Sequence, residues 1–132
     1  MRSLSDTISR LARQHARGNG AEPPSGQRLT SLEGFGSNPG ALDARLHVPV
    51  GLRPGSGLVV VLHGCTQTAE RYDSGSGWSR LADEYGFVVL YPEQIRANNT
   101  NLCFNWFQPA DIERGLGEAL SIRQMIQATA VK

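Results

Sequence analysis

Residues 58–67 read LVVVLHGCTQ, and the predicted fold follows mainly from this segment. Its first five residues are all apolar and mostly β-branched, which is typical of a strand covered by helices on both faces. His63 and Gly64 follow at once, and the glycine lets the backbone turn sharply where the chain leaves the strand. We therefore predict a buried parallel strand over residues 58–62 that ends in a tight turn.

A second apolar run, FVVLY at residues 87–91, repeats this pattern. Four residues between the two runs mark a helix that Gly86 would end: Trp78, Leu81, Ala82 and Tyr85. The order strand, helix, strand predicts a βαβ unit with a right-handed crossover. Residues 92–105 then form a long Asn-rich loop, and loops at the carboxyl ends of parallel strands are where α/β folds carry function.

Segments on either side of this unit complete an expected α/β domain over residues 28–132. Residues 28–33 and 44–48 are strand-like and are separated by glycines and an Asn-Pro-Gly turn, so we expect two antiparallel edge strands. A helix within residues 109–131 would bury a face of five apolar residues: Leu116, Leu120, Ile122, Met125 and Ile126.

Residues 1–27 form a separate region in this interpretation. An apolar stripe that ends at His15 predicts an amphipathic helix, and the Pro-, Gly- and Ser-rich segment after it reads as a linker. The first twenty residues carry charges throughout and lack the apolar stretch of an export signal. From the sequence alone we therefore expect a cytoplasmic location.

Composition and charge exclude several classes of protein. The 13 Lys and Arg against 12 Asp and Glu leave no basic surplus for nucleic acid or an anionic bilayer, so we expect neither as a partner. No apolar run is long enough to cross a membrane. Two cysteines alone cannot form a structural zinc site, which needs four ligands, and we expect no metal.

The chain resembles the N-terminal half of the polyhydroxybutyrate (PHB) depolymerase family of esterases in three segments: MRSLSDTI at 1–8, LTSLEGFGSNPGALDARLHVP at 29–49, and residues 58–126. These esterases are α/β-hydrolases related to feruloyl and acetylxylan esterases. The resemblance implies an incomplete α/β-hydrolase sheet, with antiparallel edge strands followed by parallel strands and flanking helices. It also implies hydrolysis of polyester, feruloyl or acetyl esters through an acyl-serine, without a cofactor. Many members of the family are secreted.

The resemblance also implies roles for residues in and near the turn. The backbone N–H of Cys65 would be one donor of an oxyanion hole, aimed by the turn at His63 and Gly64, although the turn could simply link strand and helix. His63 and Gly64 would also contact the substrate. Gln67 and Tyr72 would contact it too, or else cap a helix or face solvent. Three aromatic residues would wall the pocket or pack in the core: Phe104, Trp106 and Phe107.

Cys65 and Cys103 form a possible disulfide in the same picture. Both would follow parallel strands at one edge of the sheet, with Cα atoms about 4.4–6.8 Å apart if bonded. Two free buried thiols are the other interpretation. Arg96, Asn98 and Asn99 would structure their own loop.

The residues that would perform the chemistry are missing. A serine esterase of this fold needs Gly-x-Ser-x-Gly, then an acid, then a histidine, and no such motif occurs in the 132 residues. The string DSGSG at 73–77 begins with Asp and does not match this motif, and we interpret it as a loop and N-cap without a role for Ser76 as nucleophile. His15, His47 and His63 all lie too early to be the base.

We therefore predict a truncated esterase that is inactive alone and ends just before the nucleophile. Two alternatives stay open. One is a half-enzyme that another chain completes with serine, acid and histidine. The other is a binding protein that uses the remaining cleft without turnover. An unpaired sheet edge would also favour self-association of the chain.

Overall fold

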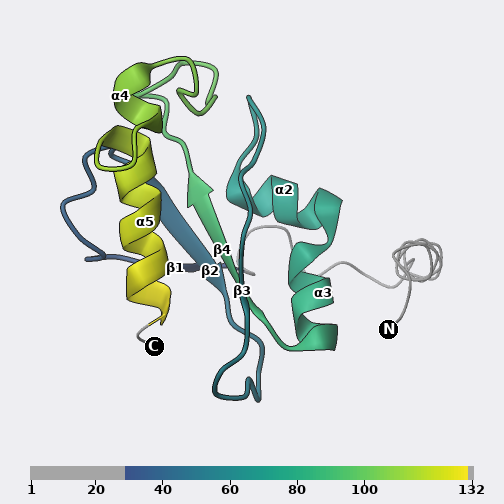
Figure 1. Ribbon diagram of the computed structural model, residues 1–132. Helices are drawn as coiled ribbons and strands as arrows, with labels where there is room; N and C mark the ends of the chain where they lie inside the picture. The colour runs from purple at the N-terminus through teal and green to yellow at the C-terminus, as the bar shows by residue number, and fades with distance from the viewer. Residues whose placement is uncertain (1–28, 131–132) are drawn as a thin grey trace.

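The computed structural model describes residues 29–130, which form a sheet with helices on both faces (Figure 1). The expected N-terminal helix and linker over residues 1–27 lie outside the described residues. In chain order, the elements are β1 (Thr30–Ser31), β2 (Asp43–His47), β3 (Leu58–Val60), α2 (Ala69–Ser76), α3 (Trp78–Tyr85), β4 (Val88–Glu93), α4 (Pro109–Ile112) and α5 (Gly117–Ala130).

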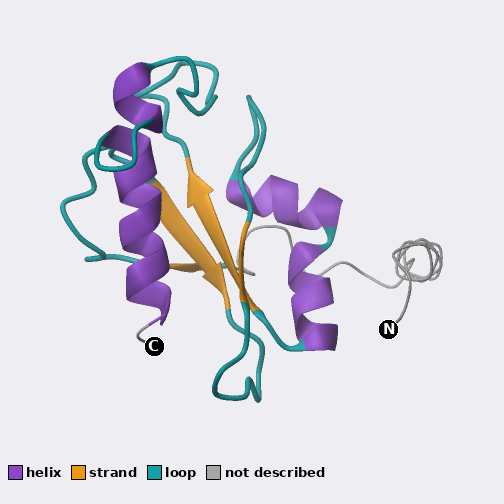
Figure 2. Ribbon diagram, in the orientation of Figure 1, coloured by secondary structure: helices purple, strands orange, loops and turns teal. Residues whose placement is uncertain are grey.

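The four strands are ordered β1-β2-β4-β3 and form a mixed sheet (Figure 2). β1 and β2 pair antiparallel, β2 and β4 pair antiparallel, and β3 and β4 pair parallel. Leu90 of β4 therefore lies between Leu46 of β2 and Val60 of β3. The βαβ unit and the antiparallel strands are confirmed. The prediction that β2 is an edge strand is wrong, because β2 lies between β1 and β4.

β3 was expected to be buried on both faces, and this is wrong as well. Residues 58–60 are only partly buried, and Leu62 just beyond them is 47% exposed. The reason is the position of β3, which pairs only with β4 among residues 29–130 and so lacks cover along its other side. β4 is the central strand instead, and Val89 and Leu90 within it are fully buried. Self-association through the edge of β3 stays a prediction.

Two apolar layers follow from the alternation of side chains along β4. Val89 and Tyr91 point to the face covered by α2 and α3, where they join a cluster with Ala69 and Ala82. Leu90 points to the opposite face and packs with a cluster that contains Met125 of α5 and the apolar side of β2. Figures 1 and 2 show α5 on one side of the sheet and α2 with α3 on the other. The α/β fold class is confirmed.

α3 has the predicted bounds, but α2 before it was not predicted. Thr68 is the N-cap of α2, and its hydroxyl accepts from the Arg71 N–H at 3.2 Å. The string at 73–77, expected to be a loop, is the end of α2 and its C-cap, since Gly77 adopts φ 76°. The same string was also predicted to cap a helix. In agreement with this part, the Asp73 carboxylate accepts from the Ser79 N–H of α3 at 3.0 Å.

α5 differs from its predicted apolar face. Leu116 precedes the helix and is 49% exposed, and Ile126 is also exposed. Met125 is buried as predicted, and Ile122 packs against the same apolar cluster. The other buried positions of α5 are polar, namely Glu118 and Ser121. Polar contacts explain the difference, because the Gly40 N–H donates to the Ser121 hydroxyl at 2.8 Å and other loops bind Glu118.

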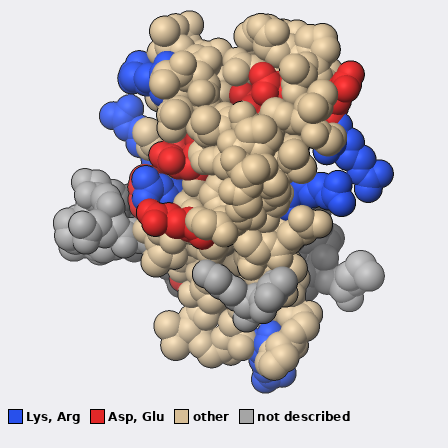
Figure 3. Space-filling view, turned by 90° about the vertical axis from the view of Figure 1, so that its left-hand side faces the viewer, with Lys and Arg blue, Asp and Glu red and all other residues tan. Residues whose placement is uncertain are grey.

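The charges on the surface and the length of the helices can be compared with what the composition indicated. On the face shown in Figure 3, acidic and basic side chains are interspersed and do not gather in a patch of one sign. Within residues 29–130, no helix combines the length and the apolar character needed to cross a membrane.

Candidate active site

The turn after β3 is built largely by its own groups. The Gly64 N–H donates to the side-chain oxygen of Gln67 at 2.7 Å, and the Gln67 N–H donates to the Gly64 carbonyl at 3.3 Å. The Thr66 N–H donates to the carbonyl of Asn101 at 2.7 Å, which ties the turn to the Asn-rich loop. Gln67, which we expected near the substrate, therefore uses its side-chain oxygen to close the turn.

His63 is buried, with 5% of its surface exposed, and both of its ring nitrogens have partners within the protein. Nε2 lies 3.0 Å from the backbone N–H of Gln94, which can only donate. Nδ1 therefore carries the proton and donates to the Gly64 carbonyl at 2.8 Å. Because a peptide unit is planar, fixing this carbonyl also fixes the direction of the Cys65 N–H that shares its plane.

Cys65 presents the candidate oxyanion donor. The residue is exposed, and its backbone N–H donates to no acceptor within residues 29–130. Its neighbours restrain it, since the His63 ring holds the Gly64 carbonyl on one side and Thr66 is tied to the loop on the other. A backbone N–H that is held in place and left unpaired is what an oxyanion hole requires.

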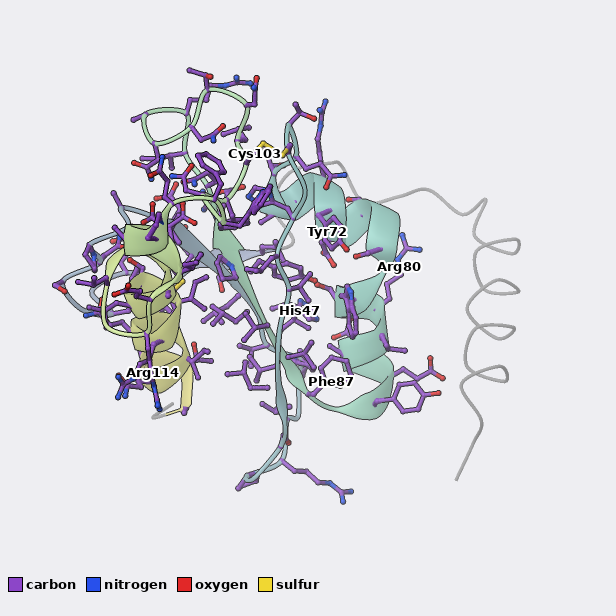
Figure 4. The ribbon with its side chains drawn as sticks, turned by 45° about the horizontal axis from the view of Figure 1, so that its top comes forward. His47, Tyr72, Arg80, Phe87, Cys103 and Arg114 are labelled. Carbon is purple, nitrogen blue, oxygen red and sulfur yellow. A yellow bond between two sulfur atoms is a disulfide. The ribbon has the colours of Figure 1, made fainter. Side chains whose placement is uncertain are left out.

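A disulfide joins Cys65 to Cys103, with an S–S distance of 2.06 Å, and Figure 4 shows it beside the labelled Cys103. The Cα atoms are 4.2 Å apart, slightly closer than the expected range. Thr66 and Leu102, which follow and precede the two cysteines, adopt positive φ values of 63° and 57°. Such backbone costs about 1–2 kcal/mol per residue outside glycine, and the bridge helps to hold it.

The bridge should be visible in a thiol-labelling experiment. Without reductant, alkylation of the denatured chain should add no label, because both sulfurs are bonded. After reduction, mass spectrometry should find two labels, and the Cys103→Ser variant should carry one label in either condition. Two labels on the unreduced chain would show free thiols and contradict the bridge.

A buried polar network that was not predicted from the sequence lies behind the turn. The side-chain NH₂ of Gln94 donates to Glu118 at 2.7 Å and to the Cys103 carbonyl at 3.0 Å. The Asn105 N–H donates to both oxygens of Glu118, at 3.1 and 3.0 Å. Burial raises the pKa of Glu118, an effect that these hydrogen bonds oppose and the nearby charge of Asp111 reinforces. One signal was available: Glu118 occupies the same helical stripe as Met125, where an apolar residue is expected.

The aromatic residues divide into two environments. Phe104 is partly buried, and its ring centroid lies 4.9 Å from that of His63, so it supports the turn. Trp106 and Phe107 are 74% and 53% exposed and contact each other edge to face. Tyr72, which Figure 4 labels, is partly buried against the α2 and α3 side of the sheet. Its position is that of a packing residue.

Three loop residues that we expected to structure the Asn-rich loop make contacts of that kind. The Asn98 side chain donates to the carbonyl of Gly40 at 2.8 Å and to Gln94 at 3.0 Å. The Asn99 side chain accepts from the Cys103 N–H at 3.3 Å, and Arg96 donates to the Thr100 carbonyl at 3.1 Å. The loop is thereby braced against the rest of the domain.

The remaining candidates lie apart from the turn. Ser76 is exposed at the end of α2, and His47 of β2 is 2.7 Å from Asp83 of α3. His15 lies outside the described residues. Residues 29–130 contain no group of three or more His, Cys, Asp or Glu side chains arranged to hold a metal ion. A groove of about 420 Å³ lies along β1 and β2, and the turn does not line it.

A parallel strand pair joined by helices, with a His-Gly turn at the carboxyl end of its first strand, is the arrangement of an α/β-hydrolase. The solved acetyl xylan esterase from Aspergillus awamori supports this class, with a TM-score of 0.71 and 31% identity over 78% of this chain. The chain belongs to the esterase PHB depolymerase family, whose model matches residues 43–132.

Two curated relatives carry the names of different ester substrates. Poly(3-hydroxyalkanoate) depolymerase C of Paucimonas lemoignei is 56% identical over 98 residues, which is 74% of this chain. Acetylxylan esterase A of Talaromyces purpureogenus is 34% identical over 102 residues, which is 76% of this chain. The matched segments are only 23% and 26% of these two proteins, and 37% of the A. awamori esterase.

Proposed function

We propose that this chain supplies the oxyanion side of the active site of a carboxylic-ester hydrolase. The observation that carries this proposal is the unpaired N–H of Cys65, within the described residues, on a braced turn at the end of β3. In ester hydrolysis the substrate carbonyl oxygen becomes negatively charged, and a preorganised backbone donor stabilises that charge. Membership of an esterase family supports the same chemistry.

The rest of the reaction needs groups for which these residues offer no candidate. A serine would attack the ester carbon, a histidine would take its proton, and an acid would orient the histidine. The second oxyanion donor would be the N–H that follows the serine. His63 uses both ring nitrogens within the protein, and no Gly-x-Ser-x-Gly is present. We therefore propose that the 132 residues alone do not turn over esters and need a polypeptide that carries these three groups.

For the substrate, we propose a polyester of hydroxyalkanoates ahead of acetylated xylan. The two relatives are named for these two ester classes, and the identity to the poly(3-hydroxyalkanoate) depolymerase is 56% against 34%. Trp106 and Phe107 would offer the alkyl chain of such a polyester an exposed apolar surface. Both classes share the ester carbonyl that Cys65 would face.

A fusion tests this function. Residues 1–132 would be joined to the part of the P. lemoignei depolymerase that follows its matched segment, and hydrolysis of p-nitrophenyl butyrate would be measured. We expect the isolated chain to give neither saturable hydrolysis nor labelling by a fluorophosphonate, and the fusion to give both. The fusion with its elbow serine changed to alanine is the control.

Each part of this expectation can fail separately. Stoichiometric fluorophosphonate labelling of the isolated chain, at Ser76 for example, would show that the chain has its own nucleophile. A folded fusion without esterase activity would count against the oxyanion role. Activity on mixing the two polypeptides unjoined would show instead that the chain acts as one half of a two-chain enzyme.

A further inference from the structure

The Gly64–Cys65 peptide is connected to helix α5 through hydrogen bonds. Its carbonyl accepts from Nδ1 of His63, and Nε2 of the same ring accepts from the Gln94 N–H. The side chain of Gln94 then donates to Glu118 at 2.7 Å. Each hydrogen bond links one group of this series to the next without a gap. The position of Glu118 is therefore transmitted, through Gln94 and His63, to the orientation of the peptide.

A second connection joins the same two ends through the disulfide, the chain at residues 103–105 and further hydrogen bonds. Cys65 is bonded to Cys103, and the Cys103 carbonyl accepts from the Gln94 side chain at 3.0 Å. Two residues later, the Asn105 N–H donates to both oxygens of Glu118. Glu118 therefore holds both Gln94 and the segment that contains Cys103.

Glu118 is suited to this position because it is buried and fully engaged. It is 5% exposed, both carboxylate oxygens accept hydrogen bonds, and its own N–H donates to Asp111 at 3.0 Å. A buried carboxylate is costly unless its hydrogen bonds are made, and bonds to a charged acceptor are stronger than neutral ones. Gln94 and Asn105 are thus held more firmly than a neutral side chain at position 118 would hold them.

We propose that Glu118 is a positioning residue for the oxyanion donor, which keeps the Cys65 N–H in its orientation by anchoring Gln94 and the segment at residues 103–105. Glu118 contacts no substrate in this proposal and acts only through His63 and the disulfide. The inference rests on the function proposed above, because the orientation of this N–H matters only if it binds an oxyanion.

Nuclear magnetic resonance of the ¹⁵N-labelled chain tests this link without any need for turnover. In the unmodified chain, the ring signals of His63 should show a proton on Nδ1 and none on Nε2. In Glu118→Gln, the amide signals of Gly64 and Cys65 and the ring signals of His63 should move. Exchange of the side-chain NH₂ of Gln94, which donates to Glu118, should accelerate at least about tenfold, the ratio that corresponds to losing one hydrogen bond to a charged group.

Met125→Ala is the matched control, because Met125 is equally buried on the same helix but belongs to the apolar cluster. It should destabilise the fold and leave the signals of residues 63–65 in place. Unmoved signals in a folded Glu118→Gln chain, or equal movement in Met125→Ala, would overturn the proposal. A His63 ring protonated on Nε2 in the unmodified chain would also overturn it and needs no variant. Because none of these signals depends on catalysis, they separate failure of this link from failure of the esterase function.

Discussion

Replacing Cys65 with proline should lower kcat of the esterase fusion by about 10²–10³-fold, since this is the usual cost of removing one oxyanion-hole donor. Proline has no backbone N–H, so the substitution deletes the donor that the structure leaves unpaired among the described residues. The loss should fall on kcat, because the negative charge on the oxygen develops only in the transition state. Steady-state hydrolysis of p-nitrophenyl butyrate measures it.

Cys65→Pro also removes the disulfide, so the comparison must isolate the N–H. Cys65→Ala breaks the same bridge and keeps the N–H, and Cys103→Ala breaks it from the other side without changing the turn. The ratio of kcat between Cys65→Ala and Cys65→Pro therefore reports the donor alone. If these two folded variants differ by less than about threefold, the Cys65 N–H does not stabilise the oxyanion.

Gly40→Ala should destabilise the chain by about 2–4 kcal/mol, because the added methyl group has no space and partly buried hydrogen bonds are strained. A Cβ atom at position 40 would lie 2.7 Å from Cα and 2.8 Å from N of Glu118, which belong to the backbone of α5 and cannot rotate away. The displacement would strain the bonds from the Gly40 N–H to Ser121 and from Asn98 to the Gly40 carbonyl. Urea denaturation followed by circular dichroism measures the change.

Gly75→Ala is the control for this substitution. Gly75 is the last residue but one of α2, and a Cβ atom there would have no neighbour within 4 Å. Alanine should stabilise the helix by up to about 0.5–1 kcal/mol relative to glycine, so the same chemical change should have the opposite sign. A Gly40→Ala chain as stable as the unmodified one would mean that the loop at residue 40 and α5 do not approach each other as closely as described.

Local patterns were sufficient to predict the strand–helix–strand unit. The apolar runs at 58–62 and 87–91 have no polar face, and α3 begins and ends at the residues that its spacing and Gly86 indicate. Both signals are local, because periodicity and capping depend on residues within one or two turns. The prediction failed for α2, where the local signals conflict. The end of this helix contains Asp, Ser and Gly, which are poor helix formers. The helix is stabilised instead by its N-cap and by the bond from its first N–H to Glu93.

Long-range contacts decided the features that the patterns missed. The place of β2 inside the sheet follows from its pairing with β4, and the partial exposure of β3 follows from its place at the edge. Glu118 in the buried stripe of α5 is explained by its partners in the Asn-rich loop, far away in the sequence. A helix pattern read alone has no means of showing that a loop will supply donors to a buried carboxylate.

The candidate site also combines features that neighbouring residues predict with features that depend on contacts between distant residues. A His-Gly turn after an apolar strand can be predicted from the residues alone, because that motif is contiguous and its glycine permits the turn. The folded chain was needed to show that His63 has its proton on Nδ1, that Cys65 is bonded to Cys103, and that Glu118 lies behind both. These features depend on which groups meet in space, and hydrogen bonds and disulfides form only at distances that folding brings about.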